Sequence, residues 1–215
     1  MSANTSVQKN RSEQTRQRIL TAAEKSFSAL GLYGARVDEI AADAGVNKRM
    51  IYEYFGNKEA LYQTVLERVY LRLGDCEESI IACAATADAS AAIHELVSLY
   101  FSFLRDNPSY VRMLMWENLN EGRYFNAQHL EDSRNPIKNA IHTILNHGQI
   151  QGIFREGIDE KQVLMTLFAC SFNYFSNLHT MQRIMEADFL SVEKINQRIS
   201  FITEMLLTYL AKPIL

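Results

Sequence analysis

The sequence predicts an all-α fold of about nine helices, and three observations support this class. The 215 residues include only 3 prolines and 9 glycines, too few for the frequent turns of a β-sandwich or barrel. Apolar residues recur at helical spacing along most of the chain, and no segment shows a convincing strand pattern. The composition, 47% hydrophobic and 22% charged, is that of a globular protein with a sizeable core.

Four helices are expected in the first third of the chain. Ser12 can cap the first of them, and Gly31 and Gly45 end the first and the second. Asn47 and Asn57 are good N-caps for the third and the fourth, because their side chains can accept a hydrogen bond from a free backbone N–H. The expected helices run over about residues 13–30, 37–44, 48–54 and 58–73.

Five further helices are expected after residue 75. An Ala-rich stretch leads into the first, which ends at Asn107, and a short helix follows over about residues 113–119. Pro136 suits the first position of the next helix, because proline lacks the N–H that would stay unbonded there. Asp159 and Ser191 cap the last two, which run to about residues 178 and 210.

These elements group into three parts. Residues 1–12 read as a flexible polar arm, residues 13–73 as an N-terminal helical domain, and residues 74–215 as a larger C-terminal helical domain. Residues 1–72 carry 11 Lys and Arg against 8 Asp and Glu, whereas residues 73–215 carry 11 against 17. A net positive charge on residues 1–72, beside a net negative charge on residues 73–215, favours contact between the N-terminal part and a polyanion.

Several function classes find no support in the sequence. No apolar run approaches the roughly 18 residues of a membrane span, and no secretory signal is recognised, so a cytoplasmic protein is expected. There is no Gly-rich phosphate loop, no nucleophile elbow and no Cys-x-x-Cys. No two of the five histidines lie three or four residues apart, as helical metal ligands would. We therefore expect no enzyme, no cofactor and no metal, with a metal-responsive regulator as an alternative.

The segment from Ile40 to Tyr52 has the pattern of a helix-turn-helix. Ala41 is small where a second helix must approach closely, and Gly45 follows four residues later, where the turn needs a positive φ. Polar and cationic residues at 47–49 then begin the second helix, whose N-terminal residues face base edges in the major groove in this motif. The alternative is an ordinary helical hairpin with solvated charges.

Spaced matches to a known family extend over about residues 13–73. The segments are Thr15-Arg16-x-x-Ile19-Leu20-x-Ala22-Ala23, Phe27-x-x-x-Gly31, Val37-x-x-Ile40-Ala41-x-x-Ala44-Gly45-Val46 and Ile51-Tyr52-x-Tyr54-Phe55-x-Asn57-Lys58-x-x-Leu61. In these residues the chain resembles the TetR family of bacterial transcriptional regulators. The resemblance implies a DNA-binding domain whose helix-turn-helix lies at about residues 36–55, joined to a larger C-terminal domain that binds a small molecule and dimerises.

The resemblance also implies which residues contact DNA: Arg36, Asn47, Lys48, Arg49, Tyr52, Tyr54 and Lys58. Of these, Lys58 matches a lysine that holds the DNA backbone from the start of the fourth helix. Arg36 stands where the family often has a capping Thr or Ser. The cap is therefore lost, and a bidentate phosphate donor takes its place in the sequence.

The last two expected helices have wide apolar faces, which must be covered on more than one side. Paired with their symmetry mates they would form a four-helix dimer interface. The alternative is that they are the central helices of a monomer core. A homodimer with one helix-turn-helix per chain would bind a pseudo-palindromic operator in double-stranded DNA.

Aromatic and methionine residues crowd the middle of the chain, with few basic residues among them. This composition favours an apolar pocket and a small apolar or aromatic effector, rather than a metal or a nucleotide. The candidate pocket residues are Tyr100, Met113, Trp116, Tyr124, His142, Phe168, Phe172 and His179. The expected function is a repressor of nearby genes that the effector releases from DNA. The alternative is an architectural DNA-binding protein without a ligand.

Overall fold

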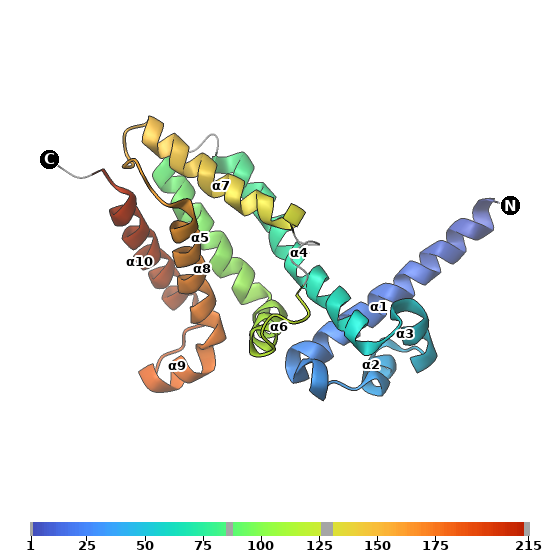
Figure 1. The fold of residues 1–215 in the computed structure, drawn as a ribbon. Coiled ribbons are helices and arrows are strands. Elements are labelled where there is room, and N and C mark those ends of the chain that lie inside the picture. Colours follow the sequence, from blue (N-terminus) through green and yellow to red (C-terminus); the bar gives the residue numbers. More distant parts are fainter. Residues whose placement is uncertain (1, 85–87, 126–130, 213–215) are drawn as a thin grey trace. The chain divides into compact units, whose positions relative to one another are not determined.

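The structure is a computed structural model, which describes residues 2–84, 88–125 and 131–212. Within these ranges the chain forms ten α-helices and no β-strand beyond one isolated bridge (Figure 1). The all-α class is therefore confirmed. The chain divides into two compact units, Met1–Tyr70 with Arg112–Ala127 and Leu71–Val111 with Gln128–Leu215.

The first unit contains the N-terminal helices. These are α1 (Ser2–Gly34), α2 (Val37–Ala44), α3 (Lys48–Phe55) and the first part of α4 (Lys58–Ala84). α2 packs against both α1 and α3. Their shared core is formed by fully buried residues of all four helices, among them Ile19, Phe27, Ile40, Ile51 and Leu61.

The structure corrects the expected start of the first helix. Helix α1 begins at Ser2, so the polar segment that was read as a flexible arm forms its first turns. No glycine or proline occurs before Gly31 to interrupt the helix, and good helix formers such as Gln8, Lys9 and Arg11 lie among the polar residues of this segment. Ser12 therefore lies inside α1 and caps nothing.

Gly31 interrupts α1 rather than ending it. Its backbone has φ 67° and ψ 179°, a conformation that only glycine adopts without strain, and the chain turns there before the last residues of α1. A Cβ at this position would lie 2.9 Å from two ring carbons of Trp116. The glycine thus allows both the bend and the close approach of an indole ring.

The C-terminal part of α6 (Pro108–Leu119) and the turn that follows it also belong to the first unit. The sequence had assigned this segment to the C-terminal domain, as part of one continuous stretch. This grouping has a physical basis in the contacts that Trp116, Glu117 and Tyr124 make with α1 and α4, which are described below.

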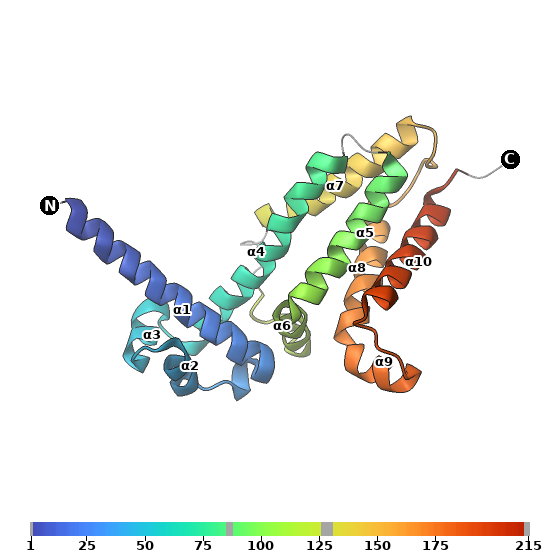
Figure 2. The same cartoon turned by 180° about the vertical axis from the view of Figure 1, so that it is seen from behind.

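The second unit is a helical bundle built around α5 (Figure 2). Helix α5 packs against α7, α8 and α10, and the short α9 follows α8. The elements are α5 (Ala89–Asp106), α7 (Glu131–Ile150), α8 (Glu160–Ser176), α9 (Leu178–Met185) and α10 (Val192–Leu210). Helix α9 was not predicted, because eight residues are too short for a periodic pattern to stand out.

The structure confirms two predicted helix caps in this unit and adds a third. The Asp159 carboxylate accepts hydrogen bonds from the backbone N–H groups of Lys161 and Gln162. The Ser191 hydroxyl accepts one from the N–H of Lys194. At α5 the Asp88 carboxylate accepts a hydrogen bond from the N–H of Ala91, a cap that was not predicted.

The segment after α7 is joined to the end of α10. Arg155 N–H donates to the carbonyl of Leu210 at 2.9 Å, and Lys212 N–H donates to the carbonyl of Ile153 at 3.0 Å. Gly148 provides the space for this arrangement, because a Cβ there would overlap the ring of the buried Phe154. The C-terminal end of α10 is therefore held in place by backbone hydrogen bonds.

Candidate nucleic-acid interface

The turn between α2 and α3 has the geometry that the sequence predicted. Gly45 adopts the left-handed conformation, with φ 63° and ψ 41°, and the N–H of Val46 donates to the carbonyl of Ala41 at 3.0 Å. Asn47 is extended, and its Oδ1 accepts a hydrogen bond from the N–H of Arg49 at 2.9 Å. The left-handed glycine at the turn and the Asn47 cap fix the start of α3.

Helix α2 starts without a side-chain cap. Arg36 occupies the N-cap position in an extended conformation and makes no capping hydrogen bond. Its guanidinium group instead lies 3.9 Å from the carboxylate of Glu39, and the side chain is mostly exposed. The loss of the cap is confirmed, and the guanidinium group is free to turn toward solvent because an exposed ion pair of this length is weak.

The two cations at the start of α3 are exposed and are paired with nearby carboxylates. Lys48 Nζ lies 2.9 Å from an oxygen of Asp38, and Arg49 Nε lies 3.0 Å from Glu53 Oε1. The hydrogen bond to Asp38 raises the pKa of the Lys48 ammonium group above its usual value. Both cationic side chains are exposed on the surface of α3.

The remaining predicted contact residues lie on α3 and at the start of α4. Tyr52 is exposed, whereas Ile51 beside it is fully buried, so α3 presents one polar face outward. The hydroxyl of Tyr54 lies 2.9 Å from the Ser12 hydroxyl of α1, within hydrogen-bond distance. Lys58 begins α4, whose first turn is capped by Asn57 through the N–H of Ala60 at 2.7 Å.

All seven residues assigned to DNA contact lie in the first unit, on α3, at the start of α4, or just before α2 or α3. A short helix with a polar and cationic N-terminal turn, set at a tight turn after another helix, is the arrangement that places side chains against base edges in a major groove. Whether each of the seven touches DNA remains a prediction.

Two family models match the chain. The model described as "Bacterial regulatory proteins, tetR family" matches residues 19–65, and the model described as "Tetracyclin repressor-like, C-terminal domain" matches residues 90–206, more than half of the chain. The chain belongs to the TetR family. It is therefore a DNA-binding transcriptional regulator and not an enzyme.

Curated TetR-type relatives and solved structures agree with this assignment. The chain is 31% identical to the transcriptional repressor NicS of Pseudomonas putida over 204 residues, 94% of this chain and 95% of the relative. It is 30% identical to the transcriptional repressor SCO4008 of Streptomyces coelicolor over 173 residues, 80% and 84% of the two chains. The structure of Bacillus subtilis FadR in complex with stearoyl-CoA has the same fold, with a TM-score of 0.63 at 21% identity, over 87% of this chain and 97% of that one.

The candidate pocket residues of the TetR-type regulatory domain are divided between the two units. Met113, Trp116 and Tyr124 belong to the first unit. The second unit holds the other five, Tyr100, His142, Phe168, Phe172 and His179. His142 and His179 are exposed, and His142 Nδ1 lies 2.8 Å from a carboxylate oxygen of Glu160. The structure therefore does not gather the eight residues within one unit.

Trp116, one of the candidate pocket residues, has contacts inside the first unit. Its ring lies against Gly31, and its Nε1 donates to the carbonyl of Ser28 at 3.3 Å. Ser28 lies one turn before the bend in α1. The aromatic side chain is thus used to hold α6 against α1.

A buried cluster beside Trp116 was not predicted from the sequence. Glu117 is only 3% exposed, and its carboxylate accepts hydrogen bonds from the hydroxyl of Tyr62 at 3.1 Å and from the N–H of Tyr124 at 2.6 Å. The Tyr62 ring also makes edge-to-face contacts with Phe27 and Tyr124. A glutamate between a tryptophan and an asparagine in a short helix gives no sign of burial in the sequence.

No helix in the described ranges has both the length and the apolar character needed to cross a membrane.

Proposed function

We propose that the chain is a homodimeric repressor that binds a pseudo-palindromic operator near the genes it controls and leaves it when a small apolar or aromatic effector binds. The observation that carries the proposal is the Asn47-capped α3, whose first turn presents Lys48 and Arg49 to solvent. The two curated relatives with the names NicS and SCO4008 are described as repressors, which favours repression over activation here.

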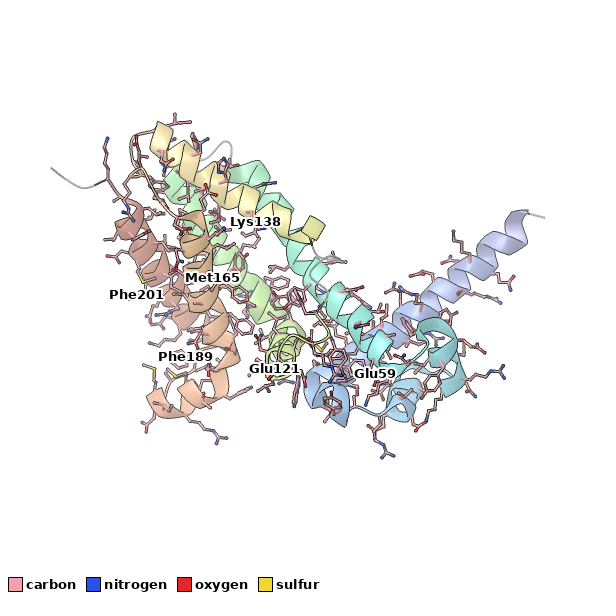
Figure 3. All side chains as sticks on the ribbon, in the orientation of Figure 1. Glu59, Glu121, Lys138, Met165, Phe189 and Phe201 are labelled. Carbon is pink, nitrogen blue, oxygen red and sulfur yellow. The ribbon has the colours of Figure 1, made fainter. Side chains whose placement is uncertain are left out.

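Exposed apolar side chains on α8 and α10 support dimerisation through these helices. Met165 on α8 is 65% exposed and Phe201 on α10 is 57% exposed, and both project from the ribbon in Figure 3. Met205 and Tyr209 follow Phe201 at intervals of four residues and are also exposed, so they form a stripe along α10. A second copy that covers this stripe would bury apolar surface that a monomer leaves in water.

Buried and half-buried aromatic side chains of the second unit support an apolar or aromatic effector. Phe101 makes ring contacts with Tyr174 and Phe175, and the rings of Phe168 and Phe172 stack with centroids 5.2 Å apart. Such rings offer dispersion contacts to an apolar ligand and few charges to a polar one.

Two helices provide a physical route for the effect of a ligand. Helices α4 and α6 each begin in one unit and end in the other. A ligand that binds one arrangement of these helices more tightly than another would change the population of the DNA-binding state. Helix α4 is thus one connection between the units, and α6 is a second.

The test combines oligomeric state, DNA binding and ligand screening on the full chain. Sedimentation should give a dimer at micromolar concentration, and gel-shift assays should give specific binding to DNA next to its own gene. A thermal-shift screen of aromatic acids, fatty acids, stearoyl-CoA, nucleotides and divalent metals would then identify ligands. A monomer in sedimentation would contradict the dimer, and release of DNA only by metals or nucleotides would contradict the effector class.

A further inference from the structure

The first turns of α1 form a basic segment that the helix-turn-helix does not account for. Residues 1–12 contain Lys9 and Arg11 and no acidic residue, and Glu13 is the first carboxylate of the chain. Both cationic side chains are exposed. Within the described residues, neither forms a side-chain hydrogen bond or an ion pair. Lys48 and Arg49, in contrast, are both paired.

Two contacts fix this segment beside α3. The Ser12 hydroxyl lies 2.9 Å from the hydroxyl of Tyr54, and the guanidinium group of Arg16 lies 5.5 Å from the centre of the Phe55 ring, a cation–π contact. Tyr54 and Phe55 are the last two residues of α3. Helix α1 is therefore held against the C-terminal end of the helix that reads DNA.

A groove runs between the two helices at this point. Its lining includes Lys9, Arg11, Ser12 and the carboxylate of Glu13 on α1, and Met50 and Tyr54 on α3. Figures 1 and 2 both show α1 running past α3, so that its N-terminal turns extend beyond the helix-turn-helix. The ten helical residues from Ser2 to Arg11 span about 15 Å at the rise of an α-helix.

We propose that Lys9 and Arg11 form a second DNA contact, in which they bind the phosphate backbone of duplex DNA that flanks the segment read by α3. The proposal rests on the operator binding proposed above. A helix that enters the major groove brings phosphates within reach of neighbouring surfaces, and unpaired cations on such a surface displace condensed counterions. This contact would add affinity without reading the sequence of the bases.

The central variant is the double substitution Lys9→Ala/Arg11→Ala. Both side chains are exposed and unpaired among the described residues, so we expect the variant to fold like the wild type. The matched control is Lys138→Ala/Lys161→Ala, which also removes two exposed positive charges but lies on α7 and α8. Circular dichroism spectra and melting temperatures of all three proteins establish that the folds are equal.

The measurement is the affinity for two duplexes at several salt concentrations. The duplexes share the footprinted operator, and one carries about ten extra base pairs, roughly one turn of B-DNA, on each side. The wild type and the control should bind the longer duplex more tightly, whereas Lys9→Ala/Arg11→Ala should bind both equally. The salt slope of this variant on the longer duplex should fall by about two per protomer, one for each lost phosphate contact.

Three outcomes would overturn the proposal. They are an unchanged salt slope, a retained preference for the longer duplex, and an equal loss in the control, which would point to overall charge alone. The failure of the proposed function looks different, because the wild type itself would then bind no duplex specifically. A further variant, Ser12→Ala, keeps both cations but loses the hydrogen bond to Tyr54, and should reduce the preference for flanked DNA. Full retention of that preference would show that this hydrogen bond does not position the segment.

Discussion

The hydroxyl of Tyr62 donates a hydrogen bond to a carboxylate oxygen of Glu117, at 3.1 Å, inside the first unit. Tyr62 is fully buried and Glu117 nearly so. The other carboxylate oxygen accepts the backbone N–H of Tyr124. A buried carboxylate is costly unless its oxygens are hydrogen-bonded, so this arrangement binds the turn after α6 firmly to α4.

Removing the Tyr62 hydroxyl should destabilise the protein. Tyr62→Phe keeps the ring contacts but leaves one oxygen of Glu117 without this donor, and we expect the free energy of unfolding to fall by about 1–3 kcal/mol. Urea unfolding followed by circular dichroism measures the change. The exposed Tyr52→Phe is the control and should change stability by less than about 0.5 kcal/mol. Equal effects of the two substitutions would contradict the role of this hydrogen bond.

The same pair predicts a dependence on alkaline pH. Burial, followed by the negative charge of Glu117, raises the pKa of Tyr62 well above the usual value of about 10. The folded protein therefore holds the phenolic proton more tightly than the unfolded chain does. This contribution to stability is complete below about pH 10 and is lost as the pH rises toward the raised pKa.

Stability measurements between about pH 8 and pH 11 test this dependence. The gap in unfolding free energy between wild type and Tyr62→Phe should narrow over that range, because only the wild type loses the contribution. A gap that stays constant across the range would show that the Tyr62 pKa is not raised.

The close contact between Gly31 and Trp116 predicts an unequal response to alanine. In Gly31→Ala a new Cβ would meet two ring carbons at 2.9 Å and would also hold a positive φ of 67°. We expect a loss of about 2–4 kcal/mol in unfolding free energy. Gly56→Ala is the matched control, because its φ is 81° and no atom lies within 4 Å of the new Cβ, so only the backbone cost of about 1–2 kcal/mol applies. Thermal or urea unfolding of the two variants should separate them clearly.

The ion pair between Lys48 and Asp38 predicts a gain in DNA affinity. Asp38→Asn removes a negative charge near α3 and releases the Lys48 ammonium group for a phosphate. We expect tighter binding by about 1 kcal/mol, roughly fivefold in Kd, at low salt. Asp43→Asn is the control, because Asp43 is paired with Lys25 of α1 at 2.9 Å and the charge change is the same. Operator titrations in which both variants gain equally would exclude a specific role for the pair with Lys48.

Local signals in the sequence were enough to predict most of the helices and the helix-turn-helix. The caps at Asn47, Asp159 and Ser191 depend on residues two or three positions away, and the structure confirms each of them. Gly45 likewise predicts the left-handed turn, because few other residues adopt a left-handed backbone conformation without strain. Such features need no knowledge of the rest of the fold.

Contacts between segments that are far apart in the chain could not be predicted from the sequence. Serine is a residue type that often caps helices, but the Ser12 hydroxyl lies beside the hydroxyl of Tyr54, 42 positions along the chain. Tryptophan is a residue type that often lines ligand pockets, but the ring of Trp116 packs on Gly31. The burial of Glu117 likewise depends on Tyr62, 55 positions earlier. One sequence offers no periodicity that could distinguish these tertiary contacts from a ligand site.

The position of Trp116 also gives the protein an intrinsic optical reporter. It is the only tryptophan among the 215 residues, so the whole indole emission comes from a ring that rests on Gly31 and donates to the Ser28 carbonyl. If α6 separates from α1, water reaches the ring and the emission shifts to longer wavelength. Spectra of the unlabelled protein, recorded as a ligand or DNA is added, would follow this one contact in real time.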